Sequence, residues 1–475
     1  MKGIFWIVVL SMFFTACNKF ASVPTPATAI TGTTIYNNDA NAIGVVTGLY
    51  SAMSSASPAQ AGTISSLSLW LGLSADELTL WNGLPNIQAL AYYQDRLDAG
   101  GPGSEYWETL YLPVYSCNAA IDALTGSASL TPAVKQQLLG EAHFMRAFLF
   151  FYLVNLYGPI PLNVTTNSQS NLTIARSSVD SVYRQIITDL QYAAATLSPA
   201  YLDGSLLNPS ADRVRPTRWA ALALLARAAL YNRDWADAEK YADTVIGNTG
   251  NFSLSGLDAV FLKASLGNQE AIWQLQPTNT GVNTEEADVF VLPATGPPNN
   301  GLGFGVYLSN SLLSSFEPGD LRRSHWIDSV TAGGTTYYYP YKYKITAYNA
   351  PVEEYPTLLR LAEVYLIRAE ARAEQNDQAG AAADLNLIRG RAGLGLITAG
   401  SQAQLLTAIL HERQVELFTE LGHRWFDLKR TRSVDSVMAL VTPIKGGTWN
   451  SEQQLYPVPS RELGLDPHLT QNPGF

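Results

Sequence analysis

One short stretch of the sequence brings acidic, amide and aromatic side chains together. It reads Asp76-Glu77-Leu78-Thr79-Leu80-Trp81-Asn82-Gly83, and Tyr92-Tyr93 follows it. This composition suits a sugar ligand, because aromatic rings stack on the apolar face of a pyranose while Asp and Asn bond its hydroxyl groups. The candidate ligand-binding residues are therefore Asp76, Trp81, Asn82 and Tyr92. The alternative is a loop that Trp81 pins to the core, with its acidic residues simply solvated.

Motifs that would carry out catalysis are missing elsewhere. His411-Glu412 is not followed by a second histidine four positions on, so the metalloprotease helix is absent. The chain has no GxSxG and no GxxxxGK[ST] motif, and its five histidines form no cluster with metal-ligand spacing. Gly301-Leu-Gly-Phe-Gly305 lacks the basic partner and capped helix of a phosphate site. A glycoside hydrolase stays open as an alternative, because its two carboxylates need only lie about 5–10 Å apart in space.

Three further stretches combine polar and aromatic residues in patterns that favour structure over chemistry. Glu317-Pro-Gly-Asp-Leu-Arg-Arg323 is typical of a turn with an ion-paired surface. The segment Tyr337 to Tyr343 alternates aromatic residues with lysine, which indicates a half-exposed strand, with a stacking platform as the alternative. Arg424-Trp-Phe-Asp-Leu428 is expected on a helix, where its Arg-Asp pair and its aromatic rings contribute packing.

The overall composition limits the classes of protein and partner. With 475 residues, 47% of them hydrophobic, the chain can bury a large core. A net charge of -10 argues against nucleic acid as a partner, because nucleic-acid binding requires a basic face. Cys17 and Cys117 are the two cysteines, and we expect Cys17 to carry lipid, so no intrachain disulfide can form.

The N-terminus has the layout of a bacterial lipoprotein leader. One lysine precedes an apolar run that ends at Thr15-Ala16-Cys17, and the run is too short to cross a bilayer. We therefore predict a signal peptide over residues 1–16, cleavage before Cys17 and acylation of its thiol. Residues 17–34 are predicted to form the acylated cysteine and a flexible tether, because Ser, Thr, Pro and Ala dominate that stretch.

Helical periodicity dominates the rest of the chain, which we expect to be mainly α. The spacing of apolar residues predicts helices over residues 38–54, 105–124, 132–157, 179–197 and 402–430. Two further segments, 218–246 and 359–391, predict helical hairpins with small alanines where the two helices approach closely. This packing is tetratricopeptide-like, although neither hairpin carries the full repeat consensus.

A single domain over residues 35–475 is expected, with two irregular insertions. The insertions lie near residues 70–103 and 251–355. Within the second, residues 270–276 and 335–345 are β-prone, and residues 278–305 between them are rich in glycine and proline. Long irregular insertions in a compact domain are usually functional surfaces. We therefore expect the loops and a few short strands to form a ligand-binding face on the helical scaffold.

Several motifs, taken in order, resemble the RagB/SusD-like family of Bacteroidetes outer-membrane nutrient-binding lipoproteins. The resemblance covers nearly the whole mature chain, and its specificity comes from the order and spacing of motifs that are each modest. The motifs are Ala75-Asp76-Glu77, Gly140 to Gly158 with Pro161-Leu162, Thr217 to Arg227, Phe316 to Arg322, Leu359 to Glu370, Glu412-Arg413 with Glu416-Leu-Phe, Gly422 to Leu428, and Gln471 to Phe475.

The resemblance implies a function as well as a fold. Members of the family cap a TonB-dependent (SusC-like) outer-membrane transporter and hand it oligosaccharides or other nutrients, and most bind without catalysing. It therefore implies a non-enzymatic glycan-binding lipoprotein at the outer membrane, facing the cell surface. The glycoside hydrolase and a tetratricopeptide-like scaffold for protein partners alone are the alternatives.

The resemblance also guides the choice of ligand residues. Because the shared motifs look structural, the ligand is expected on variable loops, where Trp81 and the insertion aromatics Phe290 and Phe304 are the candidates. No cofactor is implied, with a structural calcium ion as the alternative. Surface-exposed lipoproteins of this phylum often have acidic residues after the acylated cysteine, and Asn18-Lys19-Phe20 departs from that pattern.

Overall fold

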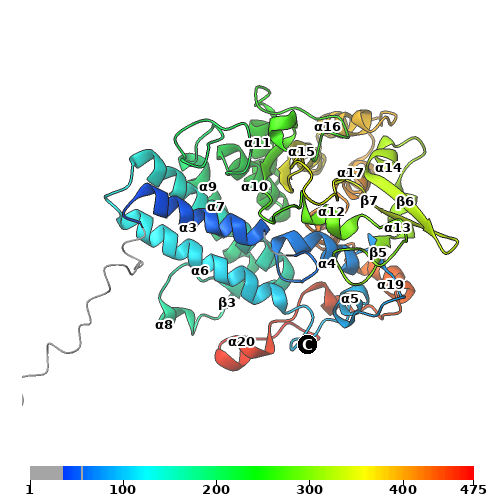
Figure 1. Ribbon diagram of the computed structural model, residues 1–475, viewed down its shortest axis with the longest axis horizontal. Coiled ribbons are helices and arrows are strands. Elements are labelled where there is room, and N and C mark those ends of the chain that lie inside the picture. The colour runs from blue at the N-terminus through cyan, green and yellow to red at the C-terminus, as the bar shows by residue number, and fades with distance from the viewer. Residues whose placement is uncertain (1–35, 55–56) are drawn as a thin grey trace, which may run out of the picture.

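The computed structural model describes residues 36–54 and 57–475 and packs them as helices around one long central helix (Figure 1). The predicted signal peptide of residues 1–16, Cys17 and the tether of residues 17–34 lie outside the described residues. In the described part of the chain, no helix is both long enough and apolar enough to cross a membrane.

The four helices predicted in the first half of the chain are confirmed. They are α3 (Asp39–Ser54), α6 (Glu105–Gly126), α7 (Pro132–Tyr157) and α9 (Val179–Thr196). Helix α7 has Pro132 at its first turn and ends at Gly158, whose φ of 71° suits glycine. It is buried on nearly all sides from Leu138 to Tyr157, because apolar residues occur on every side of the helix. Helix α7 is therefore the centre of the scaffold.

Both helical hairpins form as predicted. The first consists of α10 (Arg218–Tyr231) and α11 (Trp235–Ile246), and the second of α15 (Leu361–Glu374) and α16 (Gln378–Arg391). Each turn places one residue at positive φ, Arg233 or Asn376, and then an aspartate whose side chain caps the second helix. The two hairpins lie side by side, and Arg227 of α10 pairs with Glu363 of α15 at 2.6 Å.

The prediction of one helix over residues 402–430 is wrong. Helix α17 (Gln402–Glu416) ends, and α18 (His423–Arg430) begins after a sharp turn. Thr419, Leu421 and Gly422 all have positive φ in this turn, which an α-helix excludes. The ammonium of Lys342 donates to the carbonyl oxygens of Glu416 and Phe418, both at 2.9 Å, and so satisfies the end of α17. A lysine from a segment distant in sequence therefore caps the C-terminal end of α17.

Short elements fill the remaining segments. The other helices are α4 (Leu67–Ser74), α5 (Ile87–Tyr93), α8 (Ser168–Asn171), α12 (Glu285–Phe290), α13 (Asn310–Ser315), α14 (Leu321–Trp326), α19 (Val434–Ile444) and α20 (Ser460–Leu465). The strands are β1 (Leu78–Leu80), β2 (Ile160–Pro161), β3 (Arg176–Ser177), β4 (Ala271–Gln274), β5 (Val306–Leu308), β6 (Ile327–Ala332), β7 (Thr335–Pro340) and β8 (Thr357–Arg360). They pair antiparallel as β1-β5, β2-β3, β4-β8 and β6-β7.

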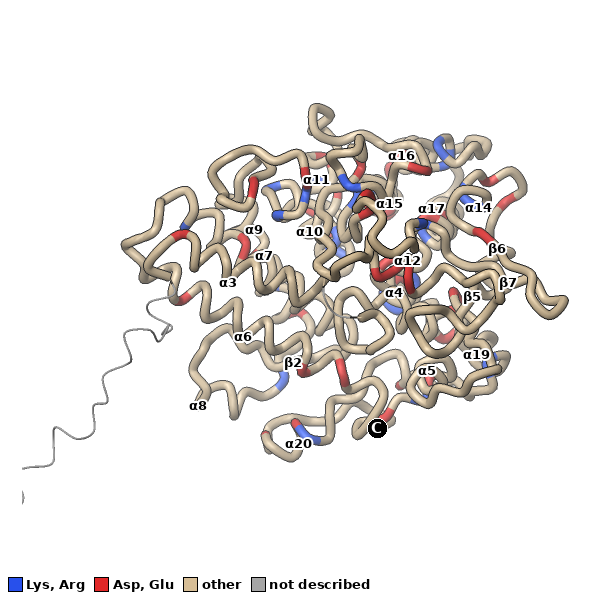
Figure 2. The backbone as a smooth tube through the Cα atoms, viewed as in Figure 1, with Lys and Arg blue, Asp and Glu red and all other residues tan. Residues whose placement is uncertain are grey.

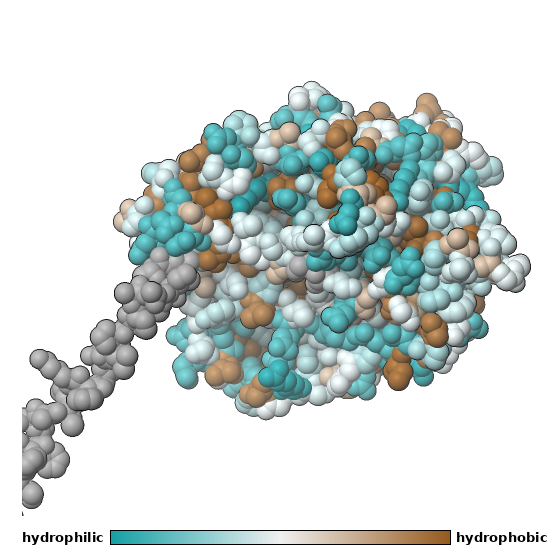
Figure 3. Space-filling view, viewed as in Figure 1, coloured by the Kyte–Doolittle hydropathy of each residue, from teal (hydrophilic) through white to brown (hydrophobic). Residues whose placement is uncertain are grey.

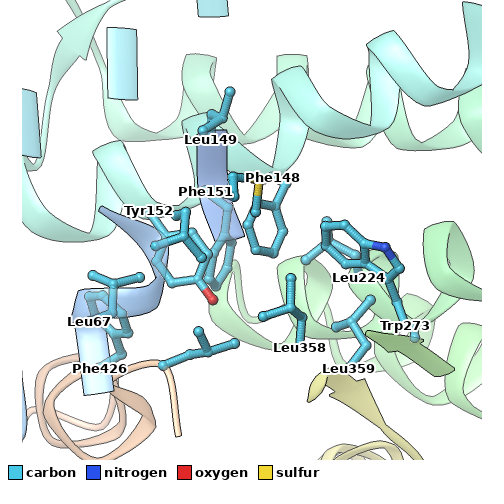
Figure 4. Close-up of a cluster of buried hydrophobic side chains, with 14 of the residues drawn as sticks. Leu67, Phe148, Leu149, Phe151, Tyr152, Leu224, Trp273, Leu358, Leu359 and Phe426 are labelled. Carbon is cyan, nitrogen blue, oxygen red and sulfur yellow. The ribbon is translucent and has the colours of Figure 1, made fainter. Parts of the chain in front are cut away.

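An aromatic core joins the scaffold to the strands. Trp273 of β4 is fully buried and meets Phe148 of α7 edge-on, with ring centroids 5.2 Å apart (Figure 4). Tyr152, one turn further along α7, lies 5.9 Å from Phe426 of α18. The core thus extends from α7 into the segment that carries the strands. It holds the second insertion against α7. On the face shown in Figure 3, hydrophobic residues are scattered in small groups among hydrophilic ones.

A network of buried ion pairs lies where the second hairpin meets the strands. Figure 2 marks the positions of the charged residues along the backbone. The centre of the network is Glu416 at the end of α17, which is fully buried. One carboxylate oxygen accepts from Arg360 at 2.6 Å and from Arg391, and the other accepts from Arg322 at 3.0 Å. Burial opposes ionisation of Glu416, but the three guanidinium groups outweigh it and hold its pKa well below the usual range.

Arg360 extends this network to a second element. Its guanidinium bonds Glu270, which precedes β4, at 3.0 Å and Glu420 at 2.7 Å. Lys342, two residues after β7, also pairs with Glu420. The network therefore connects β4, β7, β8 and α17. It holds the β6-β7 hairpin at the end of β7, next to Lys342.

We predict that Glu416→Gln destabilises the protein strongly. The substitution leaves three buried guanidinium groups short of a counter-charge, and breaking a buried pair costs about 3–5 kcal/mol. The change in the free energy of unfolding is measurable by denaturant titration. Because the pKa of Glu416 is lowered, ionised Glu416 contributes fully to the free energy of unfolding above pH 4.5, and this contribution is lost as the pH falls. The difference in the free energy of unfolding between the variant and the parent should therefore shrink in acid.

The control is Asp237→Asn, which removes an exposed pair with Lys240 and should change the free energy of unfolding by less than about 1 kcal/mol. Equal effects of the two substitutions would contradict a structural role for the network.

Candidate functional site

The ribbon of β1 and β5 has one apolar face turned to the core. The register places Leu78 opposite Leu308 and Leu80 opposite Val306. Leu78, Leu308 and Val306 are each at most 1% exposed, and Leu80 is partly buried against the same core. Because successive side chains of a strand point to opposite faces, the residues between them face outward.

The outward face of the ribbon carries two aromatic residues. Tyr307 pairs with Thr79 in the register, so their side chains share this face. The Trp81 amide donates to the Gly305 carbonyl at 2.8 Å, which continues the ladder one step beyond β1. Trp81 is two residues after Thr79 and therefore lies on the same face. Its partner Gly305 has no side chain, which leaves room for the indole.

Two glycines shape the surroundings of Trp81. A Cβ atom on Gly305 would lie 2.7 Å from the Trp81 Cβ, and one on Gly83 would lie 2.1 Å from the far edge of its indole. The indole therefore lies against the backbone at both positions, where no other residue fits. This close approach explains the glycine at position 305.

Two further tyrosines extend the outward face. Tyr337 of β7 meets Tyr307 edge-on, with ring centroids 5.2 Å apart and an interplanar angle of 76°. Tyr93, the last residue of α5, lies beside the Thr79 side chain. Burial raises the pKa of Tyr93, so it stays a neutral phenol at physiological pH. We call Trp81, Tyr93, Tyr307 and Tyr337 the aromatic platform; all four are half-buried.

Three predicted ligand residues are buried in the core and do not lie on the platform, which corrects the prediction. Tyr92, Phe290 and Phe304 are 0%, 5% and 1% exposed. The rings of Tyr92 and Phe304 lie 4.9 Å and 6.0 Å from that of Trp70, which is fully buried. Their burial prevents them from stacking on a ligand, and they contribute to the hydrophobic core.

Asp76 is also corrected from a ligand residue to an anchor. It is 3% exposed, and its two carboxylate oxygens accept from Arg424 of α18 at 2.7 and 2.8 Å. Burial acts to raise the pKa of Asp76, but the bonds and charge of Arg424 outweigh it and hold the pKa below its usual value. Lys445 donates to the Ala75 carbonyl at 2.5 Å beside this pair. The start of β1, and with it Trp81, is thereby fixed to the C-terminal helices.

Glu77 is the neighbouring buried carboxyl group. It is 1% exposed and accepts a hydrogen bond from the Thr419 amide at 3.2 Å. Burial, with the nearby charge of Asp76, raises its pKa to about 8. Glu77 therefore carries a proton at neutral pH, and its role is internal.

Asn299 fixes the end of the glycine- and proline-rich segment 278–305. It is 1% exposed, its amide donates to the Val289 carbonyl at 2.8 Å, and its side-chain oxygen accepts from the Val306 amide at 2.8 Å. Its backbone amide donates to the Phe304 carbonyl at 3.1 Å. One side chain thus satisfies the backbone on both sides of the loop and sets the entry into β5.

Two of the six predicted ligand residues reach the surface. Trp81 is half-buried and Asn82 is exposed in the turn that follows it, and their roles as ligand residues stay predictions. Sequence reasoning missed Tyr93, Tyr307 and Tyr337. Tyr93 adjoins the predicted Tyr92, and Tyr337 begins the aromatic run that left a stacking platform as its alternative. Tyr307 gave no signal, because its place depends on pairing with a distant strand.

A metal centre is not apparent in the described segments. No group of three or more His, Cys, Asp or Glu side chains among residues 36–54 and 57–475 is placed to hold an ion. The platform itself offers flat apolar rings with hydroxyl groups at their edges. Such a surface can hold a ligand with an apolar face and a polar rim, and a pyranose has both.

Two family profiles match separate parts of the chain. The profile described as "SusD family" matches residues 321–475. The profile described as "Starch-binding associating with outer membrane" matches residues 76–230. The chain is also 24% identical to SusD-like protein P25 of Formosa agariphila over 428 residues, which covers 78% of each chain.

Solved structures share the fold at low sequence identity. A SusD superfamily protein from Bacteroides vulgatus matches with a TM-score of 0.78 and 19% identity, covering 93% of this chain and all of that one. A protein named "Laminarin binding SusD-like protein" matches with a TM-score of 0.75 and 22% identity, with coverage of 93% and 100%. The helical scaffold with short strands is therefore that of SusD-like proteins.

We predict that Glu77→Gln flattens part of the pH dependence of stability. The folded-state pKa of Glu77 is about 8 and its ordinary value is 4.5, so folding takes up a proton between these pH values. The contribution of Glu77 to the free energy of unfolding is therefore most favourable below pH 4.5, and it falls as the pH rises to about 8. Glutamine does not ionise, so the variant lacks this pH-dependent contribution to stability. Denaturant titrations at about pH 5 and pH 8 should show the variant gaining on the parent at the higher pH.

Glu108→Gln is the matched control, because the Glu108 side chain is 74% exposed and should leave the pH dependence unchanged. If Glu77→Gln and the parent keep a constant difference across this range, Glu77 is ionised in the fold and its assignment is wrong.

Proposed function

Because the chain belongs to the SusD/RagB-like family, we propose that it is a glycan-binding protein whose ligand lies on the aromatic platform. The observation that carries the proposal is the outward face of the β1-β5 ribbon. Trp81 and Tyr307 share that face, and Tyr337 and Tyr93 continue it on either side. The printed name of one structural neighbour, which says that it binds laminarin, supports the same class of ligand.

The chemistry of the platform favours a neutral oligosaccharide over other ligands. Half-buried rings can each remove apolar sugar surface from water, at roughly 25 cal/mol per Å². The phenol groups and the exposed Asn82 amide can bond sugar hydroxyls at the rim. Tyr307 and Tyr337 meet edge-on, so their planes differ by 76°, which suits a curved chain of sugars better than a flat one.

The finer parts of the proposal concern location and partner. We propose that the protein is acylated at Cys17, lies at the outer membrane facing the cell surface, and passes its glycan to a SusC-like, TonB-dependent transporter without cleaving it. The description of the matched family as associating with the outer membrane supports the location. The net charge of -10 is consistent with attachment by lipid and not by a basic surface.

We predict that Trp81→Ala weakens glycan binding while the protein stays folded. Losing one stacked aromatic ring removes about 1.5–3 kcal/mol, which is roughly a 10- to 100-fold loss of affinity. Tyr307→Ala should act in the same direction. A glycan array identifies a ligand, and isothermal titration then gives its dissociation constant for each variant.

Tyr115→Ala is the control, because Tyr115 is 49% exposed on α6, away from the platform. It should bind as the parent does. If Trp81→Ala binds normally, or loses affinity only because its melting temperature collapses, the platform is not the ligand site. Failure of the parent to bind any glycan, together with co-purification of a transporter, would favour a scaffold for protein partners.

The absence of catalysis is tested on the glycan that the array selects. Prolonged incubation with purified protein should release no new reducing ends above the level of a buffer blank. Release that requires an intact platform would instead identify a glycoside hydrolase.

A further inference from the structure

A pocket lies apart from the platform. It has a volume of about 320 Å³ and is formed by α3, the loop between α9 and α10, and the chain just after β4. In Figure 1 these elements lie away from the β6-β7 hairpin, and no platform residue lines the pocket. We call it the Asp212 pocket. Its polar lining includes Thr47, Tyr50, Ser51, Asp212, Arg215 and Gln276.

Arg215 is held rigidly at the wall of this pocket. Glu141 of α7, which is fully buried, accepts from Arg215 at 2.8 Å and from the Tyr50 hydroxyl at 2.9 Å. Thr47 accepts a second N–H of Arg215 at 2.5 Å. A guanidinium has five N–H donors, and these bonds use two of them. Glu141 thus neutralises the charge of Arg215, and other N–H groups of its guanidinium stay available to a ligand.

Asp212 supplies the opposite kind of group. Its Oδ1 atom is buried and has no hydrogen-bond partner among the described residues. Buried polar atoms of this kind are rare, because each one left without a partner costs about 1–3 kcal/mol. Arg215 is bonded to Glu141 and Thr47, so it does not satisfy Asp212 Oδ1. The pocket therefore requires a hydrogen-bond donor and disfavours an anion.

The rim of the pocket is preformed. In the loop between α9 and α10, Asp203 accepts from the Ser205 amide at 3.0 Å and from the Asn208 side chain at 3.1 Å, and Leu202 and Pro209 form an antiparallel bridge. On the other side, the Ser54 hydroxyl donates to the Gln276 carbonyl at 2.7 Å. A ligand would therefore enter a site that needs little reorganisation.

We propose that the Asp212 pocket binds one neutral sugar ring, independently of the platform. A ring hydroxyl donates to Asp212 Oδ1, a neighbouring oxygen accepts from Arg215, and the Ser51 hydroxyl bonds another ring hydroxyl. The volume is at the small end of the range for ligand pockets, which fits a monosaccharide unit and excludes a folded peptide. The proposal stands on the pocket itself and does not require the platform to bind glycan.

Ligand-observed saturation-transfer NMR with D-glucose, D-galactose and D-mannose, each titrated separately against the full chain, tests the proposal. At least one hexose should bind saturably. Asp212→Ala should weaken that binding at least tenfold, because a hydrogen bond to a charged group is lost, and Trp81→Ala should leave it unchanged. The second variant, Ser51→Phe, fills the pocket from its half-buried rim and should abolish binding without touching Asp212.

Asp180→Ala, at an exposed position in the first turn of α9, is the matched control and should bind as the parent does. Three results would overturn the proposal: none of the three hexoses binds, binding survives both Asp212→Ala and Ser51→Phe, or binding is lost in Trp81→Ala. The last result would place the hexose on the platform, and the platform proposal would then stand without a second site.

Discussion

The fold depends on the rule that a charge taken out of water needs a counter-charge and a full set of hydrogen bonds. Glu416, Arg360 and Arg322 are each at most 2% exposed, and an unpaired ion at such a depth costs several kcal/mol. Their partners come from segments far apart in the sequence, such as Glu270 before β4 and Glu412 on α17. Charge pairing therefore selects one relative arrangement of hairpin, strands and turn that hydrophobic packing alone would leave less specified.

The same rule positions the aromatic platform without using any of its residues. Lys342, two residues after β7, joins the network through Glu420 and so holds the strand that carries Tyr337. At the other strand, the Asp76-Arg424 pair fixes the chain just before β1. The buried charged residues thus hold the strands in position. The outward-facing rings take no part in these ion pairs, so their residue types can change without breaking them. A scaffold of this kind can present different ligand surfaces while its interior stays the same.

The helical scaffold could be predicted from the sequence because a period of 3.6 residues and capping residues are local signals. The break after α17 could not, because it depends on Lys342 reaching the carbonyl of Glu416 and on positive φ at Thr419, which no local pattern indicates.

The site was predicted only in part, for related reasons. The acidic and amide neighbours of Trp81 indicate it in the sequence. No local signal separates Tyr92 from Tyr93, although the structure buries the first and leaves the second half-buried. Phe304 was chosen for its loop composition, but it packs inward against Trp70. The position of Tyr307 follows from its pairing with Thr79 between β1 and β5. This is a contact between distant segments, and the local sequence of neither segment indicates it.

The central claim is that the ligand rests on outward-facing rings held by an interior that does not take part in binding. A crystal structure of the protein with an oligosaccharide selected by binding tests it most directly. The account predicts sugar rings over Trp81 and Tyr307, with the Asp76-Arg424 pair intact. A glycan bound elsewhere, or an Asp76 released from Arg424 to bond the sugar, would contradict it.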